Sequence, residues 1–458
     1  MKNLTERIET AVKQQKDFFA SGATLDIEVR INKLNKLQKM ILKHEKEICE
    51  ALFLDLHKSP EESVFTEIQM ILSEIKYHIR HLSRWNKPRR VPFSLFTLPG
   101  QGFVQYQPYG VVLIIAPWNY PFQLLMNPLI GAISAGNCAI LKPSPQSVHT
   151  SALMARLINE YFSDRYICLF EGDTEVNQTL LAQKFDYIFF TGGPGFGRYV
   201  AECAARTLTP VTLELGGKSP CIVDKSADID LAAHRIVWGK LLNAGQTCIA
   251  PDYILAEQSI KSELIKRLEK YIIHTFGVNP KLNPIYPRII SEAATQRLAT
   301  LLSESGSIVF GGQYDIKEKY FSPTIILDPA PESNIMREEI FGPILPVIEY
   351  GRIEEAISFI NMRPKPLALY YFGNKHTARK IMYHTSSGGM CINDTLMHIA
   401  NPHIPFGGVG ESGMGRYHGR ESFRTFSNPR GIHESSVRID PAFRYAPYKI
   451  PQFFKRFL

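Results

Sequence analysis

Hydrophobic residues recur at intervals of three and four along the first part of the chain, which predicts amphipathic helices between about residues 26 and 86. Lysine and glutamate separate the apolar positions, which are Ile31, Leu34, Leu37, Ile41 and Ile48. Pro88 and Pro92 end this pattern, and the segment "FVQYQPYG" after them predicts a short strand. The N-terminal quarter is therefore expected to be mostly helical.

From position 109 the pattern changes to short, continuous apolar runs that end in glycine or a turn. The runs are "GVVLIIAP", "CAILKP", "ICLFEG", "DYIFFTGG" and "VTLELGG", followed by "SPCIVD" and "DYILAE". Continuous apolar runs are typical of strands buried on both faces, and their alternation with helical stretches predicts a doubly wound parallel sheet. A second α/β region begins near Lys218. Ligands of such sheets bind at the carboxyl ends of the strands, so the residues after each run are the candidates for chemistry.

Composition and charge restrict the class of protein. The 458 residues are 45% hydrophobic, and 52 basic against 44 acidic residues give a formal charge of +8. The densest cationic segment is the short "KPRR" at 87–90, so we expect no nucleic-acid partner. Seven dispersed cysteines without a CxxC pair favour a reducing, cytoplasmic location and argue against a cysteine-based metal site.

One stretch, residues 122–141, is long enough and apolar enough to suggest a membrane span. Four residues interrupt it, namely Gln123, Asn127, Pro128 and Asn137. A buried helix that leads into a buried strand is the favoured interpretation, and no transmembrane segment or secretory signal is expected.

Two strand ends carry features that suit a nucleotide. "TGGPGFGR" follows one apolar run and precedes a helical stretch, so its backbone amides and the helix N-terminus could hold phosphate, although a tight left-handed turn explains the glycines equally well. Lys142 ends another run. It is either a surface lysine that reaches solvent or a cation beside a ribose or phosphate.

Three polar residues are candidates for catalysis. Glu214 lies inside an apolar strand, where burial would raise the pKa of its carboxyl group and make it a general base, unless a lysine or a backbone amide pairs with it. Asn119 lies between prolines in "PWNYP", which fix the direction of an amide donor, but asparagine is also common in such turns. Cys248 in "NAGQTCIAPDY" is either a buried thiol or a nucleophile, and none of the 13 histidines is near it in sequence.

Taken together, the motifs resemble the aldehyde dehydrogenase superfamily in order and spacing. They are "PWNYP", "LKPS", "FTGG", "LELGGKSP", "GQTCIAPDY", "EEIFGPILPV" and "PFGGVGESGMGRYHG". The chain from "INDTLMHIANPH" onward is similar to the class 3 branch, which includes fatty and aromatic aldehyde dehydrogenases. The resemblance implies a Rossmann-like cofactor domain (1–90 and 109–213), an α/β catalytic domain (214–410) and an oligomerisation arm (91–108 and 411–458). It also implies NAD or NADP as cofactor, a homodimer and no metal.

The resemblance assigns a role to each candidate residue. Cys248 corresponds to the nucleophile, Asn119 to the oxyanion donor and Glu214 to the base that activates water. Glu339 corresponds to a nicotinamide-ribose contact that is also a candidate base in some members, and Tyr120 to the substrate pocket. The remaining cofactor contacts are Trp118, Lys142, Gly192, Gly193, Gly197, Leu215, Gly216 and Phe341.

Two positions depart from the family pattern. The family commonly has a glutamate three residues after the lysine of "KPS", where it binds the adenosine ribose, but this chain has Pro145. A carboxylate at that place repels a 2′-phosphate, so we expect NADP to be tolerated at least as well as in relatives with the glutamate. Pro194 removes one amide donor from the glycine turn, which puts the pyrophosphate contacts in question.

The sequence predicts oxidation of hydrophobic aliphatic or aromatic aldehydes, with two alternatives kept. One is a cofactor-independent esterase or acyl transferase that uses Cys248, and the other is a catalytically silent binding protein on the same fold. The tail "YKIPQFFKRFL" is expected to pack against a partner subunit, with a peripheral membrane contact as the alternative.

Overall fold

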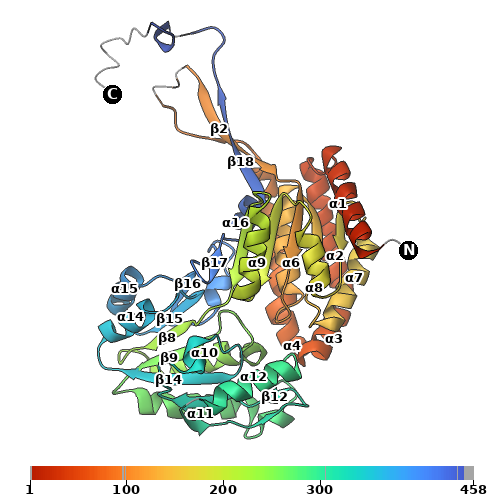
Figure 1. Cartoon of the computed structure of the whole chain (residues 1–458). Coiled ribbons are helices and arrows are strands. Elements are labelled where there is room, and N and C mark those ends of the chain that lie inside the picture. Colours follow the sequence, from red (N-terminus) through yellow and green to blue (C-terminus); the bar gives the residue numbers. More distant parts are fainter. Residues whose placement is uncertain (1–2, 95–96, 98, 305, 441, 448–458) are drawn as a thin grey trace.

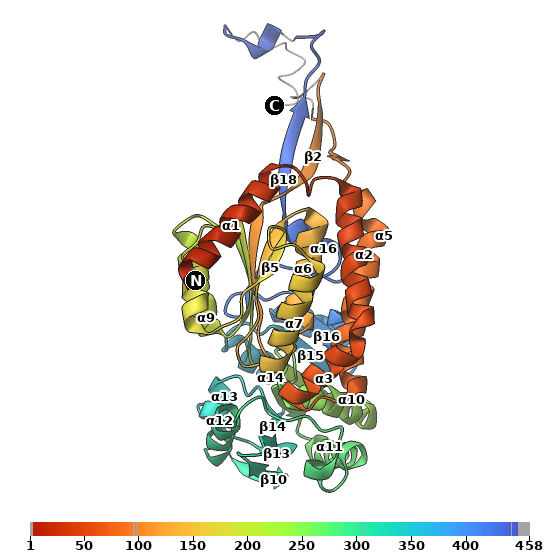
Figure 2. The same ribbon diagram turned by 90° about the vertical axis from the view of Figure 1, so that its right-hand side faces the viewer.

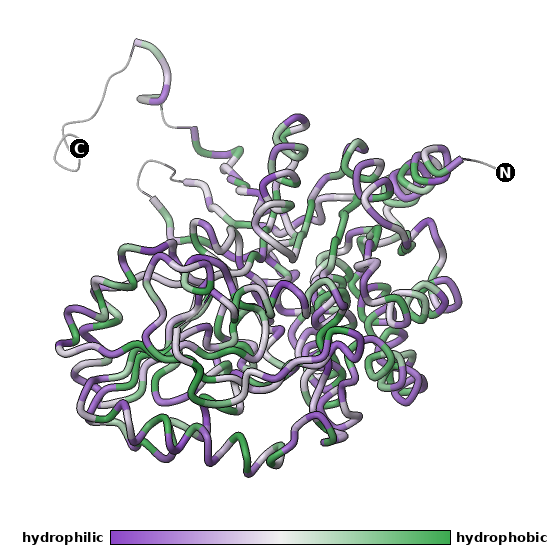
Figure 3. Tube along the Cα trace, turned by 60° about the horizontal axis from the view of Figure 1, so that its bottom comes forward, coloured by the Kyte–Doolittle hydropathy of each residue, from purple (hydrophilic) through white to green (hydrophobic). Residues whose placement is uncertain are grey.

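Two twisted sheets form the body of the molecule, and a narrow arm projects from one end of it (Figures 1 and 2). The structure is a computed structural model that describes residues 3–94, 97, 99–304, 306–440 and 442–447. Strands are rich in hydrophobic residues and lie inside the two bodies, whereas the surrounding helices alternate hydrophobic and hydrophilic residues along their length (Figure 3). Burial of the strands on both faces is what their continuous apolar sequences require.

The first sheet has the strand order β17-β7-β6-β3-β4-β5, in which the short β17 is antiparallel and the other strands are parallel. Its strands are β3 (Val111–Ile115), β4 (Cys138–Lys142), β5 (Ile167–Leu169), β6 (Tyr187–Gly192), β7 (Val211–Leu215) and β17 (Gly413–Met414). The order doubles back at β3, so the carboxyl ends of β3 and β6 flank a switch point of the kind at which doubly wound sheets bind ligands.

Helices cover both faces of this sheet, with α1, α8 and α9 on one side and α6 and α7 on the other (Figure 2). The elements are α1 (Leu4–Ala20), α2 (Ile27–Lys43), α3 (Glu45–Leu56), α4 (Pro60–Ser63), the π-helical η1 (Val64–Ile68), α5 (Gln69–Trp85), α6 (Gln123–Ala135), α7 (Val148–Tyr161), α8 (Thr174–Leu181), α9 (Pro194–Ala205) and α16 (Arg420–Thr425). Helices α2 and α5 pack together and against α6, which places the segment between α3 and α5 near the start of α6.

The second sheet has the order β10-β13-β14-β9-β8-β15-β16, in which only β10 is antiparallel. Its strands are β8 (Pro220–Val223), β9 (Tyr253–Glu257), β10 (Ser307–Phe310), β13 (Thr324–Leu327), β14 (Ile344–Tyr350), β15 (Ala368–Phe372) and β16 (Gly389–Ile392). The helices of this body are α10 (Ile229–Leu241), α11 (Lys261–Phe276), α12 (Glu292–Ser303), α13 (Asn334–Arg337), α14 (Ile353–Asn361) and α15 (Lys375–His384). Shorter elements are the 3₁₀ turns η3 (Leu242–Gly245), η4 (Pro280–Leu282) and η5 (Met397–Ile399), and a two-stranded ribbon, β11 (Tyr314–Asp315) and β12 (Tyr320–Phe321).

The arm is an antiparallel sheet of β1 (Arg89–Arg90), β2 (Gln101–Pro108) and β18 (Ser427–Glu434), and η6 (Ala442–Arg444) lies beyond it. Strand β18 pairs with β2 along its full length although the two are distant in sequence. This sheet joins residues 101–108 to residues 427–434. The tail at 448–458 lies outside the described residues.

The predicted fold class is confirmed, and the predicted strands form where the apolar runs are. Residues 122–141 form α6 and most of β4, and the α6 residues are buried throughout. Among the described residues, no helix combines the length and apolar character needed to cross a membrane. The domain limits stay a prediction.

Candidate active site

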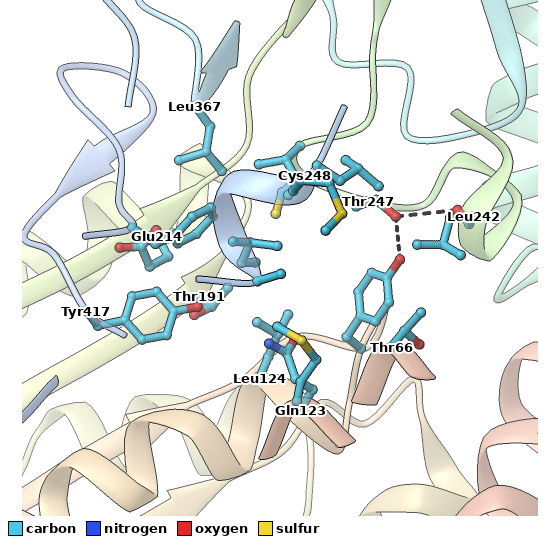
Figure 4. A pocket seen from close by; sticks show the side chains of 18 of the residues that line it. Thr66, Gln123, Leu124, Thr191, Glu214, Leu242, Thr247, Cys248, Leu367 and Tyr417 are labelled. Atoms are coloured by element: carbon cyan, nitrogen blue, oxygen red, sulfur yellow. Dashed lines mark hydrogen bonds between the residues drawn. The ribbon is translucent and has the colours of Figure 1, made fainter. Parts of the chain in front are cut away.

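One cavity of about 210 Å³ brings together some of the side chains that the sequence singles out, and Asn119 and Lys142 are not among its lining residues (Figure 4). Cys248 and Glu214 both line it, although Glu214 lies in β7 of the first sheet and Cys248 lies in the loop between η3 and β9. Tyr120, Leu215 and Thr247 line it as well. The rest of the wall is mostly apolar and includes Phe65, Met70, Leu124, Trp238, Leu242, Ile249, Leu367, Leu396, Met397, Ile399 and Phe406.

A tightly held turn presents Cys248 to this cavity. Asn243, Ala244 and Gly245 have left-handed backbone conformations, with φ of 52°, 51° and 77°. Such conformations are costly for residues other than glycine and persist only where the surroundings impose them. The buried side chain of Gln246 imposes them here: it donates to the carbonyl groups of Asn243 and Arg288 and accepts from the backbone amide of Ile290.

Asn119 lies beside this turn and is 2% exposed. Its Nδ2 donates to the carbonyl oxygen of Gln246 at 3.0 Å, and its own carbonyl oxygen accepts from Asn243 Nδ2 at 2.7 Å. A carboxamide nitrogen carries two N–H groups, so the second remains for an oxygen of a ligand. The loop after β3 is thereby joined to the loop that carries Cys248.

Tyr120 makes a further connection between the two loops. Its hydroxyl group lies 2.7 Å from Thr247 Oγ1, the residue before Cys248 (Figure 4). Burial and the nearby Glu62 raise the pKa of the Tyr120 phenol well above its ordinary value, so it stays neutral. Tyr120 lines the cavity, and its contact with the substrate stays a prediction.

Glu214 is a buried carboxyl group, 3% exposed, and its two carboxyl oxygens have no hydrogen-bond partner among the described residues. Burial raises its pKa well above the ordinary value, and the charge of Arg416 offsets this only in part. A carboxylate that is deprived of partners is a strong base once it is ionised. The alternative of a Glu214 paired with a lysine or a backbone amide is therefore not observed.

The thiol of Cys248 is surrounded by protein, with its sulfur at the cavity wall. Burial raises the pKa of this thiol, and the negative charges of Glu339 and Glu214 raise it further, while the backbone amides of Cys248 and Ile249 lower it. In this structure the protonated thiol is favoured, so formation of the nucleophile requires a base or a change in the charge of the site.

Glu339 lies at a second, wider cavity of about 900 Å³ between the two bodies, and Phe341 is not among its lining residues. Glu339, Gly216 and Pro194 line this cavity. A Cβ atom on Gly216 would lie 1.9 Å from Glu339 Oε2, so only glycine fits there. Burial raises the pKa of Glu339 to about 8, and the charge of Asp252 adds to the effect. The Phe341 ring meets that of Trp118 edge to face, with the centroids 5.3 Å apart.

The residues of this second cavity fit a dinucleotide. Gly193 caps α9 and Pro194 is its first residue, where a helix leaves the N–H group unbonded in any case, so the proline does not weaken the helix. Added Cβ atoms on Gly193 and Gly195 would meet nothing within 4 Å, which leaves the open approach that a phosphate needs. The cavity wall also carries five cationic side chains, namely Arg198, Lys218, Arg337, Arg363 and Lys365.

Two further glycines have packing roles. A Cβ on Gly197 would lie 2.5 Å from a Leu215 methyl group, and one on Gly192 would lie 2.5 Å from the Phe190 ring. Gly197 therefore allows α9 to approach β6 and β7 closely, whereas Gly192 leaves room for the Phe190 ring within β6. The close approach places the helix N-terminus at the sheet's carboxyl edge.

Lys142 is 1% exposed, so the interpretation as a surface lysine that reaches solvent is wrong. Its Nζ donates to the carbonyl oxygen of Pro143 at 2.8 Å. Burial lowers its pKa to about 8. A buried ammonium group with one hydrogen bond at a sheet edge retains donors for a ribose or phosphate oxygen.

Three charged residues beside the site were not foreseen from the sequence: Glu62, Lys58 and Glu67. Lys58 and Glu67 form an ion pair of 2.6 Å in which both side chains are fully buried. The pattern Ser59-x-x-Glu62 is a capping signature and predicts only the start of a helix. Nothing in the sequence distinguishes these residues from lysines and glutamates on a solvated helix face.

The described residues contain no group of histidine, cysteine or carboxylate side chains that could hold a metal ion. All seven cysteines are unpaired.

Comparison with known proteins shows the family to which the chain belongs. A family model described as the aldehyde dehydrogenase family matches residues 2–432. A 4,4'-diaponeurosporen-aldehyde dehydrogenase of Staphylococcus aureus is 47% identical over 98% of this chain and 99% of its own length. A dimeric, NADP-preferring aldehyde dehydrogenase of Mus musculus is 43% identical over 97% of this chain and 99% of its own. A solved structure, a substrate-bound state of Staphylococcus aureus AldH, matches with a TM-score of 0.95, 46% identity and 98% coverage of both chains.

Proposed function

The chain belongs to the aldehyde dehydrogenase family and oxidises aldehydes with NAD or NADP, and we propose that Cys248, Asn119 and Glu214 perform this reaction on apolar aldehydes. The observation that carries the proposal is the shared cavity: a thiol and an unpaired carboxyl group line one mostly apolar space. A bound aldehyde would thus lie between a nucleophile and a base.

Each residue has a defined task in this scheme. Once the Cys248 thiol has given its proton to water, its sulfur bonds to the aldehyde carbon and the π electrons of the C=O bond pass to the oxygen. The free N–H of Asn119 Nδ2 and the backbone N–H of Cys248 then donate to this oxyanion. NAD or NADP supplies the acceptor for the hydride that leaves the substrate carbon. The resulting thioester on Cys248 is hydrolysed by a water molecule that gives a proton to Glu214, which releases the acid and the thiol.

The cofactor is proposed to lie in the 900 Å³ cavity and to extend across the carboxyl edge of the first sheet. Glu339, Trp118 and Phe341 would contact its nicotinamide half, with Gly216 and Leu215 beside them. The turn of Gly192, Gly193 and Gly197 would hold the pyrophosphate at the start of α9, and Lys142 the adenosine ribose. Residues 1–90 and 109–213 would form the cofactor domain and residues 214–410 the catalytic domain.

A homodimer is proposed from the exposed edges of two sheets. Strand β16 ends the second sheet and β18 ends the arm, and among the described strands neither has a partner on its outer side. Unpaired edges of this kind are templates for pairing with another chain. A cytoplasmic location is also part of this proposal. Light scattering after size exclusion gives the oligomeric state.

The test of the catalytic proposal is Cys248→Ala. We expect NAD(P)H formation with aldehydes to fall by at least about 10⁴-fold while cofactor binding persists, since this change removes the nucleophile and leaves the second cavity intact. Retained oxidation would overturn the assignment. Slow ester hydrolysis in the absence of cofactor would argue against the acyl-transfer alternative. A wild-type chain that binds cofactor but oxidises no aldehyde would support the alternative of a silent binding protein.

Substrate class is tested with straight-chain aldehydes of increasing length, assayed with both cofactors. Each buried methylene contributes about 0.8 kcal/mol, so kcat/KM is expected to rise by up to about 4-fold per carbon until the cavity is full. A series that is flat with length, or highest for short charged aldehydes, would contradict the apolar preference.

A further inference from the structure

The chain between α3 and α5 carries a buried pair of opposite charges. Lys58 precedes α4, and Glu67 lies in η1, the single π-helical stretch among the described residues. Their charged atoms lie 2.6 Å apart and both side chains are fully buried. Burying two charges is costly unless each gains further hydrogen bonds. The other groups that Lys58 and Glu67 contact therefore indicate which parts of the structure the pair stabilises.

Glu67 holds the start of α6. Its Oε2 accepts the backbone N–H groups of Phe122 and Gln123, both at 3.0 Å. These are among the first N–H groups of a helix, which have no partner within it, and a carboxylate there also complements the helix dipole. Phe122, at the N-cap position, has no side chain that could do this.

Lys58 holds the loop just before that helix. Its Nζ lies 3.5 Å from the Asn119 carbonyl oxygen and 4.2 Å from the centre of the Tyr120 ring. The ion pair thus contacts residues 119–123 at two places: the cation contacts the loop, and the anion contacts the start of the helix that follows.

A third charged residue ties the same segment to the cysteine loop. Glu62 Oε1 accepts the backbone N–H of Asn243 at 2.8 Å. Asn243 Nδ2 in turn donates to the Asn119 carbonyl oxygen at 2.7 Å. The two loops that carry the amide of Asn119 and the sulfur of Cys248 are therefore fastened to one short helical segment.

We propose that Lys58 and Glu67, supported by Glu62, are positioning residues that fix the Asn119 amide relative to the Cys248 sulfur. The proposal rests on the proposed roles of Asn119 and Cys248. None of the three charged residues needs to touch the substrate. Glu62 lies in α4 and Glu67 lies in the π-helical turn that follows it, in keeping with the frequent occurrence of such turns at functional sites.

The chain offers a matched control for Glu67. Asp55 accepts the backbone N–H groups of His149 and Thr150, at 3.0 and 2.8 Å, at the start of α7. It is a buried carboxylate that caps a helix of the same body, but the bonds it makes are to α7 and not to the catalytic loops. Glu67→Gln and Asp55→Asn therefore remove similar structural support, and only the first disturbs the loop of Asn119.

The experiment compares these variants per active thiol, counted by alkylation with iodoacetamide. For Glu67→Gln we expect kcat to fall by about 10–100-fold while KM for NAD and the alkylation rate of Cys248 stay within about 2-fold of wild type. For Asp55→Asn, kcat per active thiol should stay within about 3-fold of wild type, even if its Tm falls as far as that of Glu67→Gln. A purely structural role for Glu67 would lower Tm and the number of active thiols and leave kcat per thiol unchanged.

A second variant keeps the test decisive if Glu67→Gln folds poorly because Lys58 is left unpaired. Lys58→Met/Glu67→Gln removes both charges, and it should show the same loss of kcat per active thiol. The positioning proposal would be overturned if the double variant and Glu67→Gln both had the same kcat per active thiol as Asp55→Asn. The Cys248→Ala variant separates the two failures: if it still oxidises aldehydes, the proposed function is wrong, whereas an inactive Cys248→Ala with a fully active Glu67→Gln refutes the positioning role alone.

Discussion

The hydroxyl groups of Tyr120 and Thr247 lie 2.7 Å apart and connect the loop after β3 to the loop that presents Cys248. The two residues are 127 positions apart in sequence, so this contact exists only when both bodies are folded and joined. Tyr120 directly follows Asn119 in sequence and Thr247 directly precedes Cys248, so each is a neighbour of a proposed catalytic residue. The bond therefore bears on the geometry of the reaction.

Tyr120→Phe and Thr247→Val should each reduce kcat/KM, and the loss in the double variant should differ from the product of the two single losses. Each change breaks the same bond, so the double variant should lose less than the product of the single losses, with a coupling energy of about 0.5–1.5 kcal/mol. The measurement is a double-mutant cycle on kcat/KM.

A second pair of buried hydroxyl groups provides the control for that cycle. Tyr187 and Thr212 lie 2.6 Å apart within the first sheet, on adjacent strands. Tyr187→Phe and Thr212→Val should couple in thermal stability but leave kcat/KM within about 2-fold. Additive effects for the Tyr120 pair would contradict a shared role in catalysis.

Glu214→Gln should separate the two halves of the reaction. If Glu214 activates the water, this variant still forms the thioester, so about one NAD(P)H per active site appears rapidly and later turnovers slow by about 10²–10⁴-fold. Rapid-mixing absorbance at the nicotinamide band measures both phases.

Hydroxylamine serves as the control for this prediction, since it attacks a thioester without a protein base and should restore turnover in Glu214→Gln. A slow first turnover with no burst would show that Glu214 acts before hydride transfer, and Glu339 would then be the better candidate for the base.

The sequence predicted the positions of the strands because a run such as residues 111–115 is apolar on both faces and has no other stable environment. It also predicted that Glu214 and Asn119 stand at strand ends, since both follow directly from the strand pattern. Their chemical roles came from the resemblance, because local pattern left a catalytic and a structural interpretation open at each position.

The support beneath the site could not be predicted in this way. Glu67 contacts Phe122, which is 55 positions away, and its burial depends on how α5 packs against α6. A lysine or glutamate in or beside an amphipathic helix usually faces solvent, and only tertiary packing buries Lys58, before α4, and Glu67, in η1. The burial of Lys142 was undecided for the same reason: a strand end can open to solvent or be covered by a helix.

The cofactor-free enzyme should lose stability as the pH rises, and Glu339 should account for part of the loss. Its pKa is raised to about 8 in the folded protein, above the ordinary value of 4.5. The folded state therefore holds this proton more tightly than the unfolded chain, and the stabilisation is complete below about pH 4.5 and is lost as the pH passes through about 8.

Glu339→Gln removes this dependence because a neutral amide does not titrate. The Tm of the variant minus the Tm of wild type should thus increase by about 2 °C or more between pH 5 and pH 8.5, measured by calorimetry without cofactor. Glu62 and Glu214 also have raised pKa values, but they are present in both proteins and cancel in the difference. A difference that is constant with pH would refute the assignment.

Pro145→Glu should shift the cofactor preference toward NAD. Pro145 is exposed in the turn after β4, next to the buried Lys142, and nothing there needs the proline ring for a hydrogen bond. A glutamate would accept hydrogen bonds from the ribose hydroxyls of NAD and repel the 2′-phosphate of NADP. We expect the ratio of kcat/KM for NADP to that for NAD to fall by about 10-fold or more, which corresponds to about 1.4 kcal/mol.

Pro145→Ala is the matched control, since it removes the ring without adding charge and should leave that ratio within about 2-fold. The effect of the glutamate should also depend on Lys142, whose pKa of about 8 means that its positive charge is retained at pH 7 and declines above pH 8. NADP use by wild type should therefore fall relative to NAD use between pH 7 and pH 9, because the phosphate loses its nearest predicted cation. Two results would show that this turn does not discriminate between NAD and NADP at the ribose 2′ position. One is the same NADP-to-NAD ratio of kcat/KM in Pro145→Glu and Pro145→Ala, and the other is strict NAD dependence of the wild-type enzyme.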